Sequence, residues 1–491
     1  MTNGKTKILE DMASTEFRKY GYELVDWIAD YLDNIEDYSV LPKTEIGEIK
    51  NSLPDQPPKS GESFETILSD FDKKIMPGIT HWNHPNFMAY FNSTSSGPGI
   101  LADLLSAGLN INGMSWHTCP SATELEEVTL NWLAQMLGIP VKFWGIIYDT
   151  ASMSSLHAVA AAREQAKELF INGEELSQSN YSQLRLYCSE QAHFSIDKCA
   201  LTLGINKEGI RKIPVDKEFR MIPEKLSEAV KQDRKNGWLP FCVVATVGTT
   251  STTSVDPVKE IATICKKEKI WLHVDAAYAG TAAIIPEMRW IFDGIENVDS
   301  IVVNPHKWMF TPIDLSAFYT SKPEMLKQAF SLSAEYLQSS SDEKVTNYMD
   351  YGIQLGRRFR SLKLWFIIKY FGVNGIRNRI REHIRLAKKF ADWIDNNDDF
   401  ERMAPVHFGV VCFRAVPKNI SDDQSLRENE LNKLNEKLLN KINSSDKLFL
   451  SHTVLNNKYT IRISISGIRT LEKNVKDAQL IIQNKLSEIL T

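Results

Sequence analysis

The sequence has no long apolar run and no excess of positive charge. No segment approaches the roughly 18 consecutive apolar residues that span a bilayer as a helix, and the opening residues MTNGKTKILEDMASTEF lack the apolar core of a secretion signal. The formal net charge of -5 argues against general nucleic-acid binding, which requires a basic surface. We therefore expect a cytoplasmic protein that binds neither membranes nor nucleic acids.

Cysteine is scarce, and no two cysteines are spaced as metal or redox pairs require. The chain has six and contains no Cys-x-x-Cys motif, so nothing indicates a zinc site or a dithiol redox centre. Scattered cysteines of this kind are typical of buried thiols in a reducing compartment. The six are Cys119, Cys188, Cys199, Cys242, Cys265 and Cys412.

The 491 residues exceed one ordinary core, since about 150 residues per domain is usual. Near the N-terminus, apolar residues recur at three- and four-residue steps, as on one face of a helix: Phe17, Tyr20, Leu24, Ile28 and Leu32. A polar, proline-rich stretch at 52–63 follows and reads as a linker. We expect an N-terminal helical segment (1–86), a large domain (87–365) and a small C-terminal domain (366–491).

The middle of the chain alternates between strand-like and helix-like segments. Four short apolar runs, separated by helical patterns, stand at 184–189, 240–248, 270–277 and 300–304. This alternation is typical of an α/β fold, with a mostly parallel sheet covered by helices on both faces.

The C-terminal region has a different pattern. The segment 355–372 is compatible with a long connecting helix, and the stretches 408–416 and 459–467 resemble strands. In the last stretch apolar and polar residues alternate strictly, which predicts a sheet with one buried face and one polar face. We expect a small α+β domain here.

Polar side chains follow the expected strands of the parallel sheet. His193 follows the first run, and a Thr/Ser cluster follows the second. Asp275 lies in the third run, and Lys307 follows the fourth in the motif NPHKW. Each residue alone has an ordinary structural explanation, such as a cap, a turn or a solvated charge. Because the carboxyl ends of parallel strands meet at one sheet edge, where ligands bind, we expect the four features to share a site.

The lysine and the aspartate together indicate pyridoxal phosphate chemistry. A lysine amine such as Lys307 can bind an aldehyde cofactor covalently. A carboxylate such as Asp275 can keep the pyridine nitrogen protonated, so that the ring accepts electrons. The flat ring also needs small or flat neighbours, and Ala277 and His193 meet that need.

A second segment suits the cofactor's phosphate. In DTASMSSLHAVAAAR, Thr150, Ala151 and Ser152 precede an alanine-rich helical pattern. Phosphates bind well at helix N-termini, where backbone amides and hydroxyls are free to donate. The sequence therefore predicts the phosphate site at the start of this helix.

With these features the chain resembles the group II pyridoxal-phosphate-dependent decarboxylases, in particular the aromatic-L-amino-acid decarboxylases. The similar motifs cover nearly the whole chain, and HVDAAYAG with NPHKW is the most specific pair. The motifs are EFRKYGYELVDWIADYL, IMPGITHWNHPNFMAYF, CPSATELE, SEQAH, GTT, WLHVDAAYAG, NPHKW and LGRRFRSLKLWF.

The resemblance implies fold-type I architecture, an amino acid substrate and a homodimer with active sites at the subunit interface. It implies that Lys307 binds the cofactor, that Asp275 contacts the pyridine nitrogen, and that the ring lies between Ala277 and His193. The remaining cofactor contacts implied by matching positions are Ala151, Ser152, Asn304 and His306 at the phosphate, and Thr250 beside the cofactor.

The resemblance also implies which residue returns a proton after CO2 leaves. That residue is Tyr336, in the polar, serine-rich segment 332–352, which reaches the neighbouring subunit's site. Relatives that form aldehydes commonly carry phenylalanine at this position, or they replace the stacking histidine. Because this chain keeps Tyr336 and His193, we favour decarboxylation to an amine. The alternative is an aromatic aldehyde synthase, which releases aldehyde, ammonia and peroxide.

Two further classes remain open from the residues alone. A metal-dependent hydrolase could use His273, Asp275 and His306 as ligands, and it would be colourless and sensitive to chelators. A cofactor-binding protein without catalysis would be yellow and show no turnover.

The resemblance also implies which residues line the substrate pocket. Trp82, Tyr90 and Phe91 fall where the family builds an aromatic pocket, so we expect an aromatic L-amino acid. Ser93 and Met114 also fall at pocket positions, but the animal enzymes usually carry other residues there. In the phosphate segment, Asp149 and Met153 stand where glycine and glutamate are common.

Overall fold

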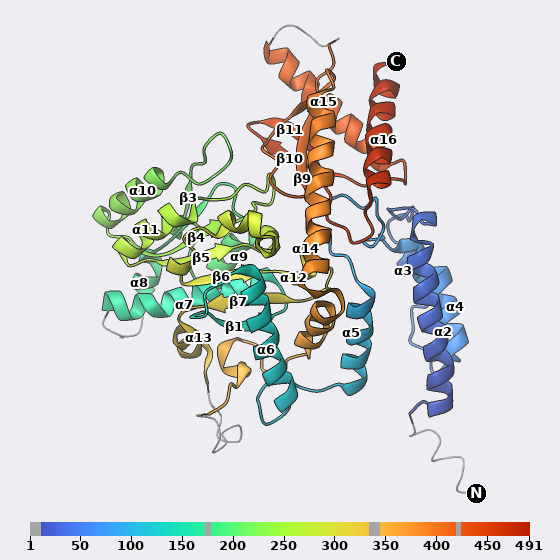
Figure 1. The fold of residues 1–491 in the computed structure, drawn as a ribbon, viewed down its shortest axis with the longest axis horizontal. Helices are drawn as coiled ribbons and strands as arrows, with labels where there is room; N and C mark the ends of the chain where they lie inside the picture. Colours follow the sequence, from blue (N-terminus) through green and yellow to red (C-terminus); the bar gives the residue numbers. More distant parts are fainter. Residues whose placement is uncertain (1–10, 172–177, 333–343, 419–423) are drawn as a thin grey trace, which may run out of the picture.

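The structure consists of two sheets, the helices around them and a group of N-terminal helices at one side (Figure 1). It is a computed structural model that describes residues 11–171, 178–332, 344–418 and 424–491. No helix within these ranges is long and apolar enough to cross a membrane.

Seven strands form the large sheet in the order β1-β7-β6-β5-β4-β2-β3. The neighbouring pairs from β3 to β6 are parallel, and β7 runs antiparallel to both β6 and β1. The four predicted apolar runs form β2, β4, β5 and β6, which confirms the mostly parallel α/β sheet. The strands are β1 (Trp144–Tyr148), β2 (Leu184–Ser189), β3 (Ile210–Ile213), β4 (Leu239–Thr246), β5 (Trp271–Asp275), β6 (Ser300–Val303) and β7 (Ser316–Thr320).

Both faces of this sheet are buried under helices. In β4, Cys242 and Val244 pack with one group of helices, whereas Val243 and Ala245 pack with the other. Burial on both faces explains why these strands are continuously apolar. The first group is α7 (Ala151–Ile171), α9 (Ser195–Thr202) and α13 (Pro323–Phe330), and the second is α6 (Pro120–Leu137), α10 (Pro223–Lys235) and α11 (Val258–Glu268).

A long helical element, α14 (Arg360–Asp395), connects the two sheets (Figure 1). It begins later and ends later than the predicted helix at 355–372, and it is kinked at Gly372, where φ is +63°. Glycine adopts this left-handed conformation without a Cβ clash. Arg357 precedes the helix, and its guanidinium donates to Glu126 (2.7 Å) and to the carbonyl of Ile147 (2.8 Å).

The small sheet has the strand order β10-β11-β9-β8, and all its neighbouring pairs are antiparallel. One face packs with α14, α15 and α16 around Ile461 and Ile463, which confirms the small α+β unit. The elements are β8 (Phe400–Arg402), β9 (Val410–Ala415), β10 (Ser451–Leu455), β11 (Lys458–Ser464), α15 (Gln424–Asn443) and α16 (Glu472–Leu490).

The prediction that one face of this sheet is polar and faces solvent is wrong for β11. Thr460, Arg462 and Ser464 alternate with the isoleucines and are buried as well. Arg462 donates from Nε to the carbonyl of Ser251, in the loop after β4, at 3.0 Å. Arg462 is therefore buried with a partner in the large-sheet layer, a contact that the alternation itself does not reveal.

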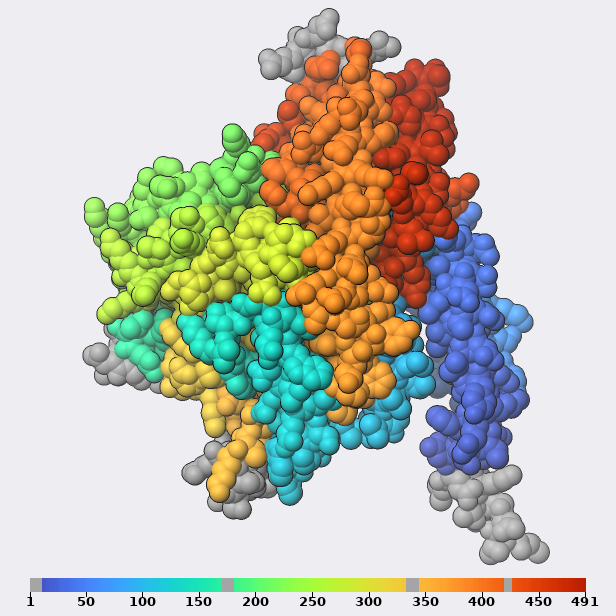
Figure 2. Space-filling model, in the orientation of Figure 1, coloured from blue at the N-terminus to red at the C-terminus, as the bar shows by residue number. Residues whose placement is uncertain are grey.

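The N-terminal helices lie at one side of the molecule (Figures 1 and 2). The 20-residue α2 (Ser14–Asp33) has no buried residue. It is followed by α3 (Glu48–Ser52), α4 (Phe64–Asp70) and then α5 (Gly97–Leu109), which packs on α14. The division into 1–86, 87–365 and 366–491 remains our proposal. Its second boundary lies within α14.

Candidate active site

The predicted strand-end residues line one cavity at the carboxyl edge of the large sheet. The cavity has a volume of about 440 Å³, within the range of small-molecule sites. Residues from the small sheet close it on one side, so both layers of the protein contribute. The lining residues are Tyr90, Phe91, Thr150, Ala151, Ser152, His193, Phe194, Ser195, Thr246, Gly248, Thr250, Ser251, Asp275, Ala277, Tyr278, Asn304, His306, Lys307, Ser451, His452, Thr453 and Arg462.

Lys307 lies on the short helix α12 (Pro305–Trp308), directly after β6. Its backbone amide donates to the carbonyl of Asn304 at 2.9 Å, which fixes the turn out of the strand. Burial lowers the pKa of its ammonium, and the positive charge of Arg462 lowers it further, whereas Asp275 acts in the opposite direction. The amine is therefore more readily available in its neutral, nucleophilic form than an exposed lysine.

Asp275 is the last residue of β5 and is held by its own backbone surroundings. Its Oδ1 accepts the amide of Ala277 at 3.1 Å, and its carbonyl accepts the amide of Val247 at 2.8 Å. Its Oδ2 has no hydrogen-bond partner among the residues that the structure describes. A buried carboxylate fixed by one oxygen, with the other available at the cavity, is suited to bind a protonated ring nitrogen.

His193 lies in the loop between β2 and α9. Its Nδ1 accepts the amide of Ser195 at 3.2 Å and lies 2.7 Å from the Ser195 hydroxyl, which assigns the ring proton to Nε2 in the neutral form. Burial lowers the pKa of this imidazole, and Lys307 lowers it further, against the effect of Asp275. The ring is thus a neutral, oriented, flat group at the cavity wall.

The start of α7 and the turn after β6 supply polar groups at one end of the cavity. The first amides of α7, after Thr150, have no partner within the helix, as at any helix N-terminus. Across the cavity end, the Asn304 Oδ1 accepts the hydroxyl of Ser316 at 2.7 Å. His306 Nδ1 accepts the amide of Leu315 at 2.9 Å, and burial lowers the pKa of this histidine to about 3.

An aromatic column forms one wall of the cavity. Phe91 stacks on Tyr278 with ring centroids 3.9 Å apart, and Tyr278 stacks on Trp308 at 4.8 Å. The Trp308 Nε1 donates to Nδ1 of His383 on α14 at 3.0 Å. The column therefore joins the cavity to the α14 helix through fixed rings.

Arg462 is a site residue that the sequence pattern did not indicate. It is 4% exposed, and its guanidinium carbon lies 4.7 Å from the centroid of Phe91. Nη1 donates to the carbonyl of Tyr90 at 2.6 Å, and Nη2 has no partner among the described residues. The alternating pattern places this arginine on the face that is expected to be exposed, so the sequence alone contains no sign of its burial.

Three buried polar atoms of residues that line the cavity have no hydrogen-bond partner in the described chain: Thr246 Oγ1, Tyr278 Oη and Arg462 Nη2. Buried polar groups are nearly always paired, so this cavity is built for a polar ligand. An amine, a carboxylate opposite it and a helix N-terminus are the three groups that pyridoxal phosphate requires. The residues present therefore fit this cofactor.

Not all predicted pocket residues reach the cavity. Tyr90 lines it, and Trp82 lies behind with its ring centroid 6.0 Å from that of Tyr90. Ser93 and Met114 do not line the cavity of this chain, so their roles in the substrate pocket remain predictions. Tyr336 lies outside the described residues.

The geometry gives the metal-hydrolase alternative no support. His273 Nδ1 lies 2.9 Å from the hydroxyl of Ser300, and its ring is not part of the cavity lining. Within the ranges that the structure covers, no group of three or more His, Cys, Asp or Glu side chains could hold a metal ion.

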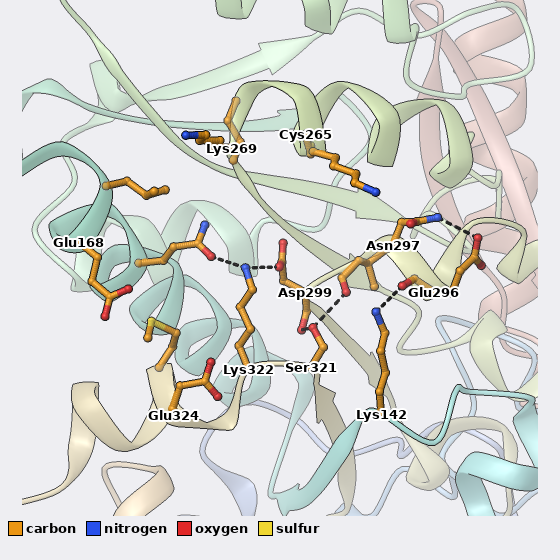
Figure 3. A pocket seen from close by; sticks show the side chains of 16 residues that line it. Lys142, Glu168, Cys265, Lys269, Glu296, Asn297, Asp299, Ser321, Lys322 and Glu324 are labelled. Carbon is orange, nitrogen blue, oxygen red and sulfur yellow. Dashed lines mark hydrogen bonds and ion pairs between the residues drawn. The ribbon is translucent and has the colours of Figure 1, made fainter.

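A second cavity, of about 550 Å³, lies at the opposite edge of the large sheet (Figure 3). Two of its lysines bond within the protein. Lys322 pairs with Asp299 at 2.7 Å, and Lys142 donates to the carbonyl of Glu296 at 2.5 Å. The Lys322 amine of this cavity is thus already paired with a carboxylate of the chain.

Comparisons with known proteins agree with this chemistry. The chain is 41% identical to a phenylacetaldehyde synthase of Arabidopsis thaliana, over the full length of both. It is 39% identical to tyrosine decarboxylase 3 of Petroselinum crispum, covering 97% of this chain and 92% of that protein. The structure of Oryza sativa TDC with PLP and tryptamine superposes with a TM-score of 0.95, at 33% identity, over 98% of this chain and 100% of that one.

The family comparison covers most of the chain. Residues 47–416 match the family described as the pyridoxal-dependent decarboxylase conserved domain. This range contains the strand-end residues, the phosphate segment and the lysine motif. The chain belongs to the pyridoxal-dependent decarboxylase family.

Proposed function

We propose that the protein decarboxylates an aromatic L-amino acid to the corresponding amine and CO2. The single observation that carries this proposal is the cavity in which Lys307, Asp275 and Arg462 meet beside the rings of Tyr90 and Phe91. The family membership fixes the cofactor class. The names of the relatives, which include tyrosine and tryptophan decarboxylases, support an aromatic substrate.

The cofactor residues have separate tasks in this proposal. Bound pyridoxal phosphate supplies a ring that takes up the electrons released with CO2. Lys307 binds the cofactor covalently, and Asp275 holds a proton at the ring nitrogen. His193 and Ala277 enclose the ring, and Thr250 lies beside it. The phosphate contacts in the proposal are Thr150, Ala151, Ser152, Asn304 and His306.

Arg462 binds the substrate's carboxylate in our proposal. Its Nη2 is buried at the cavity and has no partner among the described residues, while its other nitrogens are fixed by backbone carbonyls. A buried guanidinium without a carboxylate of its own is suited to accept one from a ligand. The aromatic side chain of the substrate would then lie towards Tyr90 and Trp82, with Ser93 and Met114 at the pocket's outer part.

Tyr336 decides between two products in our proposal. We assign it the return of a proton to the substrate carbon, as the sequence resemblance implies. Without that proton the carbanion reacts with oxygen and yields aldehyde, ammonia and peroxide. The 41% identity to a phenylacetaldehyde synthase makes this oxidative reaction the second candidate.

We also propose a homodimer with active sites at the subunit interface. The helix α2 has no buried residue, and its Phe17 and Tyr22 are 65% and 69% exposed. A row of leucines on α5 is exposed as well. Contiguous apolar surface of this kind usually marks an interface. The row is Leu101, Leu104, Leu105 and Leu109.

A cytoplasmic location completes the proposal. All six cysteines are free thiols, as suits a reducing compartment. Fractionation of cells that express the tagged chain would test it, and recovery with a secreted or organelle marker would contradict it.

The product of the reaction is the direct test of the function. With L-dopa, tyrosine, phenylalanine, tryptophan and non-aromatic amino acids as substrates, we expect CO2 and amine in equal amounts from an aromatic substrate. Tyr336→Phe should shift the product towards aldehyde and peroxide, because the proton donor is lost. Aldehyde from the unaltered chain would establish the second candidate. Unchanged products in the variant would remove the proton-donor role of Tyr336.

The role of Arg462 is tested by Arg462→Lys, which keeps the positive charge but loses the planar guanidinium with its paired N–H donors. We expect kcat/KM to fall by roughly tenfold to a hundredfold, the size of one lost hydrogen bond to a charged group. The visible absorption of bound cofactor should remain and serves as the folding control. An unchanged kcat/KM would show that the substrate's carboxylate binds elsewhere.

The dimer is tested by Leu104→Glu, which places a charge in the exposed leucine row of α5. We expect light scattering to show a monomer, because a buried unpaired charge at an interface is costly. The matched control is Leu480→Glu, on α16, where a similarly exposed leucine lies outside this row. A dimer in the first variant, or a monomer in the unaltered chain, would contradict the proposed interface.

A further inference from the structure

The carboxylate of Asp149 lies just before the N-terminus of α7, the helix that we assign to the cofactor's phosphate. Asp149 follows the last residue of β1 and precedes Thr150 and α7. Its Oδ1 accepts the backbone amide of Thr150 at 2.5 Å and the hydroxyl of Thr150 at 3.0 Å. Two donors at the start of the helix are therefore already bound to an anion of the chain itself.

The position of this carboxylate is fixed from the other side. The Gln354 side chain donates from Nε2 to Asp149 Oδ2 at 2.9 Å. Gln354 belongs to the segment before α14, which is tied to the same region because His157 Nε2 accepts the amide of Ile353 at 3.2 Å. Both carboxylate oxygens thus have a partner, and the side chain is held beside the helix N-terminus.

No cation neutralises Asp149 within the described part of the chain. Its hydrogen-bond donors are the neutral groups of Thr150 and Gln354. A titratable group that interacts electrostatically with Asp149 is His157, on α7. Burial lowers the pKa of that histidine to about 4, so it is uncharged near neutral pH. An anion that binds at Ala151 and Ser152 therefore meets the Asp149 carboxylate without a cation between them.

We infer that Asp149 weakens the binding of the cofactor's phosphate and so sets how readily the enzyme loses pyridoxal phosphate. A helix N-terminus favours one negative charge, and a second anion beside the first meets repulsion and fewer free donors. As a consequence, the fraction of enzyme that holds pyridoxal phosphate depends on the concentration of free cofactor. This inference rests on the proposed cofactor site, but it concerns affinity and not the reaction.

The test compares Asp149→Asn, which keeps the shape of the side chain, with Asp149→Glu, which keeps the charge. Cofactor is removed, and Kd is measured by absorbance titration with pyridoxal phosphate and with pyridoxal, which lacks the phosphate. For Asp149→Asn we expect the Kd of pyridoxal phosphate to fall by about three- to tenfold, as one charge near a helix N-terminus produces. The Kd of pyridoxal should stay unchanged, and Asp149→Glu should not bind more tightly than the unaltered chain.

The control for net charge is Asp398→Asn, a change at an exposed ion pair with Lys418, for which we expect no change in Kd. Equal changes for both cofactor forms, or no change for either, would overturn the inference. Failure of the unaltered chain to bind either form covalently would instead overturn the proposed cofactor site, so the two failures are distinguishable.

Discussion

The active site depends on packing two basic side chains, the buried Arg462 and the partly buried Lys307, against one aromatic ring. The Nζ of Lys307 lies 5.2 Å from the centroid of Phe91, and the guanidinium carbon of Arg462 lies 4.7 Å from it. Buried positive charge is costly unless it is compensated. The ring face and the carboxylate of Asp275 provide that compensation, and the remaining cost lowers the pKa of the lysine. The packing around Lys307 is thus also what makes its amine more reactive.

This arrangement requires both layers of the molecule. The large sheet brings Asp275 and Lys307 to one edge because β5 and β6 are parallel neighbours. The small sheet adds Arg462 from β11, whose polar side faces the large-sheet layer and not solvent. The aromatic column from Phe91 to Trp308 then links the cavity to α14, which runs between the two sheets. Displacing one layer would therefore change the charge balance around the lysine.

The sequence predicted the parts of the site that lie at strand ends and missed the part within a strand. His193, Asp275 and Lys307 were visible because parallel topology places such residues at one edge. Arg462 was missed, since in an alternating strand a polar residue is expected to face water. Similarly, the pairing of Arg357 with Glu126 just before α14 is a long-range contact that local periodicity does not contain.

The central claim is that Lys307, and no other lysine, binds the cofactor covalently. The most direct measurement is borohydride reduction of the protein loaded with pyridoxal phosphate, followed by proteolysis and mass spectrometry of the peptides. The account predicts one pyridoxyl-modified peptide, with the modification on the lysine of NPHKW. Modification of a different lysine, or none at all, would contradict the account.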